Sequence, residues 1–512
     1  MRGGEPISYG QADATANRVA NGLAGLGVGF GDRVAVMLPN APEYLYSWFG
    51  INRLGAVHVA INPAYRGDFL EHVLGNAGAG VMIVGRAFLP WLREIEDKLP
   101  ALHLALVPGL AAGEGELPAF RRIELLPFER LLDAPADPPG VEVGYADIAC
   151  IMYTSGTTGP SKGVLMPHAH CYLLGLGTVE SLRLTERDIY YVSMPLFHSN
   201  AMLMQFYGLM IAGARAFVAP AFTASGWVDD VRASGATVTN TLGVMTDFVF
   251  RQTPRPEDGQ NDLRVLLAVP APKEIREPFE KRFQVKLVEA WGMTEVNIPL
   301  YHPIEGEYRP GSCGKVLDKY FEVRIADPET DEDLPVGAVG EIMVRPKEPF
   351  AFMAGYNAME DKTVEAWRNF WFHTGDAGHR DEDGFFYFDD RIKDRLRRRG
   401  ENIAPYEIER VLADHPAVAE AAVIAVKSEF AGGEDEIKAC IVLHEGKASP
   451  RPEEMLDFCQ GRMPHFAVPR YVEFLPALPK TPTEKVQKAK LRAAALNPDT
   501  WDREEAGYEV KR

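Results

Sequence analysis

The sequence has few cysteines and no pattern that would join them. Five cysteines stand among 512 residues, and none forms a Cys-x-x-Cys pair. His168, His170 and Cys171 lie close together, but no second pair of ligands follows at the spacing of a zinc site, and we interpret this cluster as incidental. A disulfide framework or a structural zinc site is therefore not expected. A reducing compartment, the cytoplasm, is the expected location.

Long apolar runs and an excess of positive charge are also absent. The most apolar stretch, 202–218, is interrupted by Gln205 and Arg215 and is too short and too polar to cross a membrane. No cationic segment followed by an apolar core opens the chain, so no signal peptide is expected. The formal net charge is −18. Such a surface repels phosphate backbones and anionic lipids, which argues against nucleic acid and membrane partners.

The apolar pattern predicts a large α/β domain at the N-terminal side. Segments with helical spacing alternate with short apolar strands, as is typical of βαβ units around doubly wound parallel sheets. Helices are expected at 11–26, 42–54 and 66–77. Strands are expected at 32–38, 56–62, 80–84, 146–152, 189–194, 236–242, 264–269 and 285–290.

The pattern changes after residue 311. Short alternating segments separated by glycine and proline predict an antiparallel, small β-barrel-like portion, with strands at 321–326, 340–344 and 384–388. A basic run then precedes a compact α+β pattern, with helices at 406–414 and 452–460 and strands at 419–426, 436–443 and 471–474. We therefore expect a large N-terminal domain, 1–392, and a small C-terminal domain, 393–512.

One segment has the composition of a phosphate-binding loop. Residues 153–164 read Tyr-Thr-Ser-Gly-Thr-Thr-Gly-Pro-Ser-Lys-Gly-Val and follow an apolar strand, at whose end ligands of open α/β sheets bind. Glycines let the backbone approach a ligand, and hydroxyls, amides and a lysine can surround phosphate oxygens. The expected contacts are Thr154, Ser155, Gly156, Thr157, Thr158, Gly159 and Lys162. The neighbours of the lysine are not those of a Walker loop. The alternative is a surface turn without a ligand.

Six motifs, in order along nearly the whole chain, resemble those of the adenylate-forming enzymes. This superfamily comprises acyl-CoA synthetases, nonribosomal-peptide adenylation domains and firefly luciferase. Besides 153–164, the motifs are Leu38-Pro-Asn40, Trp291-Gly-Met-Thr-Glu295, Phe372-His-Thr-Gly-Asp376, Asp390-Arg-Ile-Lys-Asp394 with Gly400-Glu-Asn402, and Pro482-Thr-Glu-Lys-Val-Gln-Lys488. The chain as a whole is similar to crotonobetaine/carnitine-CoA ligases and short- to medium-chain acyl-CoA synthetases.

The resemblance implies a nucleotide site. Thr294 and Glu295 are implied beside the triphosphate of ATP, with Glu295 as a ligand of Mg²⁺, an ion usually held by one or two carboxylates and phosphate oxygens. Without the resemblance, a Thr-Glu pair is more typical of a helix cap. Asp376 is implied to accept hydrogen bonds from the ribose hydroxyls. Further nucleotide contacts are implied at Ala290, Trp291 and Arg391.

The resemblance also assigns the catalytic lysine and the hinge. Lys485 is implied to stabilise the charge that develops on the carboxylate and the α-phosphate during adenylation. Glu484 stands where the family usually has glycine, either as an ion-pair partner of the lysine or pointing away from it. Lys393 is the implied hinge of the C-terminal domain, which the resemblance implies to be mobile. The implied CoA contacts are Arg399, Gly400 and Glu401, although the basic run that contains Arg399 is otherwise a solvated face.

The acyl pocket is the part that the sequence specifies least. By resemblance its lining includes His198, Asn240, Gly243, Val244 and Gly292. His198 taken alone is otherwise a satisfied core histidine. The bulky Trp291 favours a short, medium or compact acid over a long-chain one. At 267–272 the chain reads Leu-Ala-Val-Pro-Ala-Pro where the family usually has Gly-Gly-Ala-Pro-Leu-Pro, which adds bulk beside the nucleotide or the acyl group.

Together these features imply an AMP-forming acyl-CoA ligase with ATP, CoA and Mg²⁺. An adenylation enzyme that loads a separate carrier protein is the main alternative, although no Asp-Ser phosphopantetheine motif follows Gly400. A luciferase-like oxygenase shares the same motifs. A silent nucleotide-binding protein would be expected to lack Lys485, Glu295 or Asp376, and all three are present. No specific acid is assigned, and a homodimer is left open.

Overall fold

The computed structural model describes residues 4–511 with several gaps. The gaps are 111–116, 155–159, 270, 272–274, 307, 392–395, 399–400, 404, 429–433, 445–448 and 481–485, and the side chains of residues 244, 390, 391, 397, 401, 402, 406 and 489 are not described either. The chain forms two compact units. The first comprises Met1–Pro63, Leu74–Tyr153 and Gly163–Ile392, and the second comprises Ala64–Val73, Thr154–Lys162 and Lys393–Arg512.

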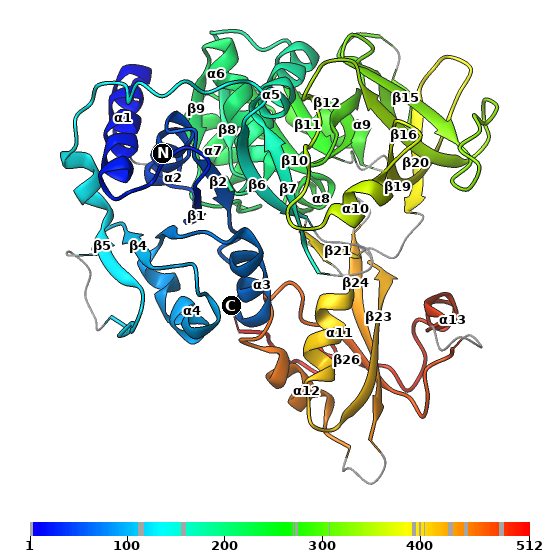
Figure 1. The fold of residues 1–512 in the computed structure, drawn as a ribbon. Coiled ribbons are helices and arrows are strands. Elements are labelled where there is room, and N and C mark those ends of the chain that lie inside the picture. The colour runs from blue at the N-terminus through cyan, green and yellow to red at the C-terminus, as the bar shows by residue number, and fades with distance from the viewer. Residues whose placement is uncertain are drawn as a thin grey trace. The chain divides into compact units, whose positions relative to one another are not determined.

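Most strands of the first sheet are parallel. Its order among the described residues is β17-β7-β6-β2-β1-β3-β4-β5 (Figure 1). The strands are β1 (Arg33–Met37), β2 (Val57–Ala60), β3 (Val81–Val84), β4 (Leu104–Val107), β5 (Glu124–Pro127), β6 (Ile148–Thr154), β7 (Lys162–Pro167) and β17 (Gly355–Tyr356). The strands from β6 to β5 in this order run parallel, and β17 runs antiparallel to β7. Strands β2, β3 and β4 are buried along their whole length, as expected for a parallel sheet covered on both faces.

The second sheet changes from parallel to antiparallel at β12. Its order is β15-β16-β19-β20-β14-β13-β12-β11-β10-β8-β9, with β18 beside β19. The parallel part contains β8 (Ile189–Val192), β9 (Arg215–Val218), β10 (Val238–Leu242), β11 (Val265–Val269) and β12 (Lys286–Met293). The antiparallel part continues with β13 (Asn297–Tyr301), β14 (Ser312–Val316), β15 (Phe321–Ala326), β16 (Gly340–Pro346), β18 (Trp367–Arg368), β19 (Trp371–Arg380) and β20 (Phe386–Arg391).

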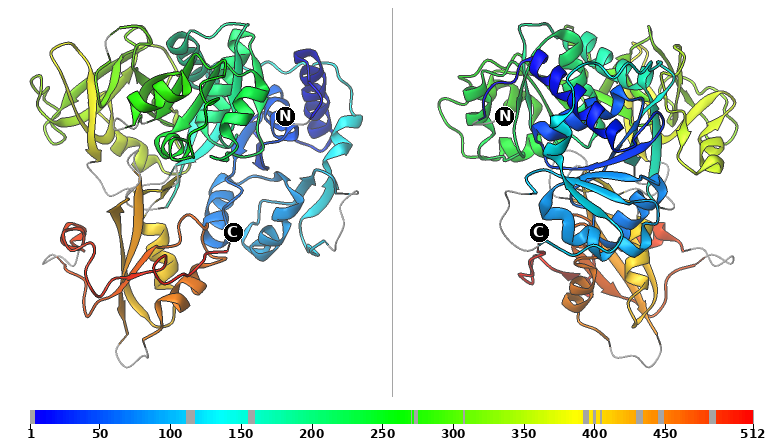
Figure 2. Two further views of the ribbon diagram at one scale, coloured as in Figure 1. Left: turned by 180° about the vertical axis from the view of Figure 1, so that it is seen from behind. Right: turned by 60° about the vertical axis from the view of Figure 1, so that its left-hand side comes forward.

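Helices surround these sheets in the first unit (Figure 2). They are α1 (Tyr9–Gly25), α2 (Pro42–Arg53), α4 (Leu89–Glu94), α5 (His168–Leu182), α6 (Gly208–Ala212), α7 (Trp227–Ser234), α8 (Gly243–Phe250), α9 (Arg276–Phe283) and α10 (Glu360–Ala366), with the π-helix η4 (Asn200–Tyr207) and the 3-10 turns η1 (Arg86–Phe88), η2 (Glu96–Lys98) and η3 (Phe128–Asp133). Helix α3 (Gly67–Ala77) begins in the second unit and ends in the first. Helix α1 begins earlier than the predicted residue 11 because Ser8 and Gln11 form a capping box.

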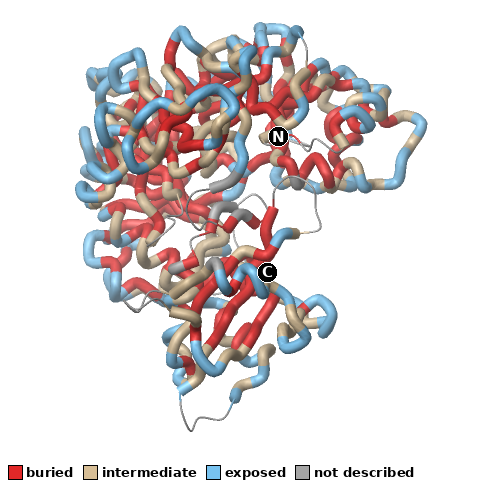
Figure 3. The backbone as a smooth tube through the Cα atoms, turned by 90° about the vertical axis from the view of Figure 1, so that its right-hand side faces the viewer, coloured by how far each residue is buried: buried red, intermediate tan, exposed pale blue. Residues whose placement is uncertain are grey.

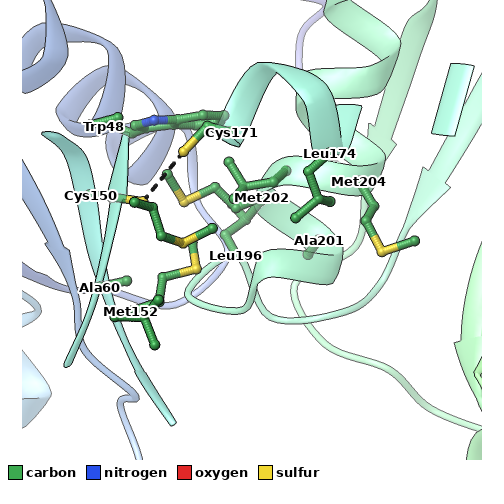
Figure 4. Close-up of a cluster of buried hydrophobic side chains, with 14 of the residues drawn as sticks. Trp48, Ala60, Cys150, Met152, Cys171, Leu174, Leu196, Ala201, Met202 and Met204 are labelled. Carbon is green, nitrogen blue, oxygen red and sulfur yellow. Dashed lines mark hydrogen bonds between the residues drawn. The ribbon is translucent and has the colours of Figure 1, made fainter. Parts of the chain in front are cut away.

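A continuous apolar core connects the two sheets of the first unit. It contains residues of β1, β2 and β6 from the first sheet, of β8, β10 and β11 from the second, and of α2, α5 and η4. Figure 4 shows part of it, where Cys150 of β6 lies beside Cys171 of α5, with 3.8 Å between the two sulfur atoms. A separate cluster, which includes Trp227, Phe279 and Phe283, packs α7 and α9 against the opposite face of the second sheet. A parallel strand such as β11 is therefore apolar on both faces. Buried residues follow the strands through the interior (Figure 3).

The second unit is an α+β structure. It contains α11 (Pro405–Ala413), α12 (Pro452–Cys459), α13 (Lys488–Ala493), β21 (Leu396–Arg398), β22 (Glu401–Ile403), β23 (Val418–Lys427), β24 (Asp435–Leu443), β25 (Tyr471–Phe474) and β26 (Trp501–Asp502). β23, β24, β25 and β26 form one sheet, and β21 and β22 form a hairpin. The core of this unit includes Phe69 of α3, Ile408 of α11 and Val423 of β23.

The predicted mixed α/β fold, with a small α+β part at the C-terminal end, is confirmed. The antiparallel strands predicted after residue 311 are present, but the predicted β-barrel-like portion is wrong. These strands extend the second sheet, and its edge strands β15 and β9 do not pair, so the described residues contain no closed barrel. The strand predicted at 384–388 begins at Phe386, because Phe385 and Gly384 close a turn on Asp381. All five cysteines are free, and no described helix is long and apolar enough to cross a membrane.

Candidate functional site

The end of β12 brings several predicted site residues into one tight hairpin. The register between β12 and β13 shifts just after Trp291. A Cβ atom on Gly292 would lie 2.2 Å from the carbonyl oxygen of Asn297, so only glycine permits this approach of the two strands. The turn that follows holds Thr294 half-buried and Glu295 only 1% exposed. Gly292, which was predicted in the acyl pocket, therefore shapes the turn that holds Thr294 and Glu295.

Trp291 and Asp376 are in direct contact. The Trp291 indole Nε1 donates a hydrogen bond to Asp376 Oδ2 over 3.1 Å, and the two residues are 7% and 4% exposed. A hydrogen bond to an ionised carboxylate is stronger than one between neutral groups. Ala290, the preceding residue of β12, is also buried. The structure thus brings together two residues that lie 85 positions apart and were both predicted to contact the nucleotide.

The backbone around Asp376 is fixed by a residue that the sequence did not indicate. Gly375 has a φ of +72°, a conformation that glycine adopts without strain, and its N–H donates to the Glu341 carboxylate over 2.8 Å. The N–H of Asp376 donates to the Thr374 hydroxyl over 3.1 Å. Asp376 also lies opposite Arg391 in the antiparallel pairing of β19 and β20. The two residues implied to contact the ribose and the nucleotide are therefore neighbours across one ladder.

Glu295 is oriented by a tyrosine hydroxyl. Tyr356 Oη donates to Glu295 Oε1 over 3.0 Å, and both residues are buried. Tyr356 lies in β17 opposite Val164 of β7, the strand that follows the predicted phosphate loop. A buried carboxylate held in one orientation is the type of oxygen donor that Mg²⁺ accepts together with phosphate oxygens, so the residues present fit this ion. Tyr356 was missed because a Gly-Tyr pair gives no signal of a distant partner.

The predicted phosphate loop is described only at its two ends. Thr154 ends β6 and Lys162 begins β7, and both are half-buried, whereas Ser155, Gly156, Thr157, Thr158 and Gly159 lie outside the described residues. Within the second unit, the N–H of Ser161 donates to the carboxylate of Glu407 over 2.9 Å, and the Ser161 hydroxyl donates to the same oxygen. A ring nitrogen of His72 lies 2.8 Å from the Ser161 carbonyl oxygen. Burial raises the pKa of Glu407 to about 7, although the two hydrogen bonds from Ser161 oppose this rise.

A second buried carboxyl group lies just before Trp291. Burial raises the pKa of Glu289 to about 8, opposed by a hydrogen bond from the Ala271 backbone and by the charge of Arg276. Glu289 is therefore mostly protonated at neutral pH. Its Oε2 atom has no hydrogen-bond partner among the described residues.

The predicted acyl residues lie at or near the carboxyl ends of β8, β10 and β12. Asn240 of β10 is fully buried, accepts a hydrogen bond from Tyr190 Oη, and donates from Nδ2 to Asn200 Oδ1 over 2.9 Å. His198 is half-buried in the turn that precedes η4. Gly243 begins α8, and the Val244 side chain is outside the described residues. Tyr190 and Asn200 were not predicted, since neither belongs to a recognised motif.

Several predicted residues cannot be located. Lys485, Lys393, Arg399 and Gly400 lie outside the described residues, as do Glu484, Pro270 and Pro272. The backbones of Arg391 and Glu401 are described at the end of β20 and the start of β22, without their side chains. The roles implied for these residues stay predictions.

Comparison with known proteins identifies similar chains over almost the full length. The profile of the AMP-binding enzyme family matches residues 1–356, and the profile of the AMP-binding enzyme C-terminal domain matches residues 407–485. The crotonobetaine/carnitine–CoA ligase of Salmonella arizonae is 32% identical over 498 residues, which cover 95% of this chain and 93% of that protein.

Solved structures of CoA ligases have the same fold. The o-succinylbenzoate CoA synthetase of Bacillus subtilis, a double mutant bound with its product analogue OSB-NCoA, matches with a TM-score of 0.82 and 25% identity over 97% of this chain and 95% of that one. An anthranilate CoA ligase in complex with anthranoyl-AMP matches with a TM-score of 0.69 and 28% identity over 95% of this chain and 91% of that one.

Replacing Trp291 tests the contact with Asp376. Trp291→Phe keeps a buried aromatic ring but removes the N–H donor, and a hydrogen bond to a charged group contributes ~1.5–3 kcal/mol. We expect the affinity for ATP, measured by isothermal titration, to fall about tenfold while the unfolding temperature changes little. Trp227→Phe is the matched control, because Trp227 Nε1 has no hydrogen-bond partner among the described residues. An equal effect of both substitutions would contradict the role of the Trp291–Asp376 bond.

Replacing Glu407 tests the buried contact with Ser161. Because the folded-state pKa of about 7 lies above the ordinary value of 4.5, ionisation of Glu407 opposes folding. Wild type should therefore lose stability relative to Glu407→Gln as the pH rises from about 4.5 to 7, by up to ~3 kcal/mol. The measurement is the difference in unfolding midpoint between the two proteins at pH 5 and pH 8. A difference in midpoint that is the same at pH 5 and pH 8 would contradict the burial of the Glu407 carboxyl group.

Proposed function

The chain belongs to the AMP-binding enzyme family and is an ATP-dependent, AMP-forming acyl-CoA ligase, and we propose that it activates a compact carboxylic acid at the end of β12. The observation that supports this site most directly is the hydrogen bond between Trp291 and Asp376. It joins two residues that the nucleotide motifs single out independently.

The reaction replaces a poor leaving group with a good one. A carboxylate acylates poorly because its leaving group would be oxide. Attack of the carboxylate oxygen on the α-phosphorus of ATP forms acyl-AMP and releases pyrophosphate. The CoA thiol then attacks the acyl carbonyl, loses its proton, and AMP departs with the bonding electrons. Acyl-AMP formation and thioester formation both require a site that holds the nucleotide.

We assign the part of that site that holds the ribose and Mg²⁺ to residues of the first unit. Asp376 accepts hydrogen bonds from the ribose hydroxyls, with Trp291 fixing its carboxylate and Arg391 opposite it on β20. Thr294 lies beside the phosphates, and Tyr356 holds Glu295 in the orientation in which it would bind Mg²⁺. Bound Mg²⁺ would neutralise charge on the phosphate oxygens. Ala290 is a further nucleotide contact in this proposal. The phosphate loop, Thr154 to Lys162, is proposed to contact the phosphates.

In this proposal the C-terminal domain, 393–512, places Lys485 at the site in the first step and the residues around Gly400 in the second. Lys485 stabilises the developing negative charge during adenylation. Rotation of the domain 393–512 about Lys393 then exchanges Lys485 for Gly400 and its neighbours Arg399 and Glu401, which admit CoA. Rotation of one domain about a short hinge is an established way to gate a reaction.

The proposed acid is short, medium or otherwise compact. Trp291 adds bulk beside the residues assigned to the acyl pocket, which are His198, Asn240, Gly243, Val244 and Gly292. The similar Salmonella protein is named for crotonobetaine and carnitine, both small acids, which agrees with this size class. We place the enzyme in the cytoplasm, where ATP and CoA are available, with no nucleic acid partner, and leave a homodimer open.

The role of Lys485 is testable through the two half-reactions. Lys485→Ala should lower acyl-AMP formation at least 100-fold, because the loss of one charge-stabilising group typically costs ~10²–10³ in rate. The same variant should still convert supplied acyl-AMP and CoA into the thioester. Lys490→Ala, an exposed lysine on α13, is the matched control and should affect neither step. An equal loss of both half-reactions would contradict the assignment of Lys485.

The first experiment measures pyrophosphate and AMP release with MgATP over a panel of carboxylic acids, each with and without CoA. We expect AMP turnover only when a compact acid and CoA are both present. Pyrophosphate exchange that CoA never accelerates would point to a carrier protein as the acceptor. Turnover with long-chain acids alone would contradict the proposed size class.

A further inference from the structure

The π-helix η4 joins two polar residues that an α-helix would separate. Asn200 and Gln205 are five positions apart, and Gln205 Nε2 donates to Asn200 Oδ1 over 3.0 Å. In an α-helix, neighbours on one face are three or four positions apart, whereas five is the hydrogen-bond spacing of a π-helix. π-Helical turns are frequent at functional sites. The π-helical spacing therefore permits the contact between the Asn200 and Gln205 amides.

These amides belong to a buried network that reaches the second sheet. Tyr190 Oη of β8 donates to Asn240 Oδ1 of β10, and Asn240 Nδ2 donates to Asn200 Oδ1 over 2.9 Å. Asn200 Oδ1 thus receives two N–H donors, one from Asn240 and one from Gln205. Two donors on one carbonyl oxygen fix the orientation of the Asn200 amide.

Asn200 is the one member of this network that is not fully buried. Tyr190, Gln205 and Asn240 are each 0% exposed, whereas Asn200 is half-buried. With its oxygen held by two donors, Asn200 turns its NH₂ group away from them, and among the described residues nothing accepts a hydrogen bond from Nδ2. The network therefore presents one NH₂ group, with two N–H donors, in a fixed orientation.

The network contains an unsatisfied atom. Gln205 Oε1 is buried and has no hydrogen-bond partner in the described part of the chain. Such an orphan acceptor costs stability, and native structures keep few of them. The apolar neighbours Ala201, Met202 and Met204 of the same helix lie in the core around Leu174 and Leu196 (Figure 4). An apolar residue at Gln205 would suit that core, so the amide is explained by its hold on Asn200.

The network lies near the carboxyl ends of the parallel strands, where the acyl residues are predicted. Asn240 lies near the carboxyl end of β10, two strands from β12 in the sheet order, and η4 follows β8 after the turn that contains His198. The carboxyl ends of parallel strands share one edge, where ligands of open α/β sheets bind.

We propose that the side-chain amide of Asn200 donates a hydrogen bond to an oxygen atom on the acyl group. The enzyme would then select compact acids that bear a hydroxyl or oxo group over plain alkyl acids. This inference rests on the proposed function. The Asn200 N–H donates to the substrate oxygen, Gln205 and Asn240 position Asn200, and Tyr190 fixes Asn240. A binding site that offers a donor rejects an analogue without the acceptor, because the donor is then left buried and unpaired.

The test compares butyrate with 2-, 3- and 4-hydroxybutyrate, measured as CoA-dependent AMP release. Wild type should use the best hydroxybutyrate with a kcat/KM at least tenfold above that of butyrate. A preference for butyrate over every hydroxybutyrate would overturn the inference but not the ligase function. No turnover of any of the four acids would overturn both this inference and the proposed acid class.

Variants at Asn200 separate recognition from folding. Asn200→Asp is isosteric, still accepts hydrogen bonds from Gln205 and Asn240, and replaces the outward NH₂ with an acceptor oxygen. A substrate hydroxyl can donate to that oxygen but an oxo group cannot, so we expect Asn200→Asp to lose turnover of 3-oxobutyrate much more than that of 3-hydroxybutyrate, while its ATP affinity and unfolding temperature stay close to wild type. Asn200→Leu, which offers neither a donor nor an acceptor and adds no charge, should bring the hydroxybutyrate-to-butyrate ratio of kcat/KM near 1.

Ser199→Asp is the matched control for the added charge. It places a carboxylate one residue away and leaves the Asn200 donor in place, so the hydroxy preference should persist. If Asn200→Leu keeps the wild-type hydroxybutyrate-to-butyrate ratio, or if Ser199→Asp abolishes it, the assignment of Asn200 as the hydrogen-bond donor to the substrate is wrong.

Discussion

The hydrogen bond between Trp291 and Asp376 constrains the whole second sheet. β12 and β19 are four places apart in the strand order, which in a flat sheet corresponds to ~19 Å. Their side chains nevertheless meet at 3.1 Å. The antiparallel part must therefore curl back over the end of β12, and register shifts in the β12–β13, β14–β20 and β19–β20 pairs supply the bending. The curl is what a barrel-like pattern in the sequence reflects, although the sheet stays open.

The sequence predicts those parts of the fold that follow from local pattern. Buried parallel strands such as β4 and β11 are apolar on both faces, so they stand out as short runs between amphipathic helices. Strand β25 is found at the predicted residues 471–474. The curl of the second sheet was not predictable in the same way, because it depends on which strands pair and where each register shifts. Strand pairing and register are determined by contacts between segments that lie far apart in the sequence.

The candidate site likewise contains residues that the sequence predicts and residues that it does not. Motif residues such as Trp291, Glu295 and Asp376 could be named from the sequence because their spacing is a local property. Their partners could not be: Tyr356 meets Glu295 from 61 positions away, and Glu341 meets the Gly375 N–H from 34. An isolated tyrosine or glutamate has no local signature of such a contact. The motifs thus identify the groups that do chemistry, while the residues that hold them in position emerge only from the fold.

Three unsatisfied polar atoms lie in or beside the elements that carry the candidate site. Ser193 Oγ, Gln205 Oε1 and Glu289 Oε2 are buried without a hydrogen-bond partner among the described residues. The first follows the end of β8, the second lies in η4, and the third lies in β12 just before Trp291. Each would be replaced by an apolar residue if packing alone decided, since burying an unpaired polar atom costs ~1–3 kcal/mol. Trp227 Nε1 is equally unsatisfied among the described residues and belongs to the cluster of α7 and α9, so an unpaired atom alone does not mark the site. What the three atoms share is a place in or beside the elements that carry the nucleotide and acyl residues.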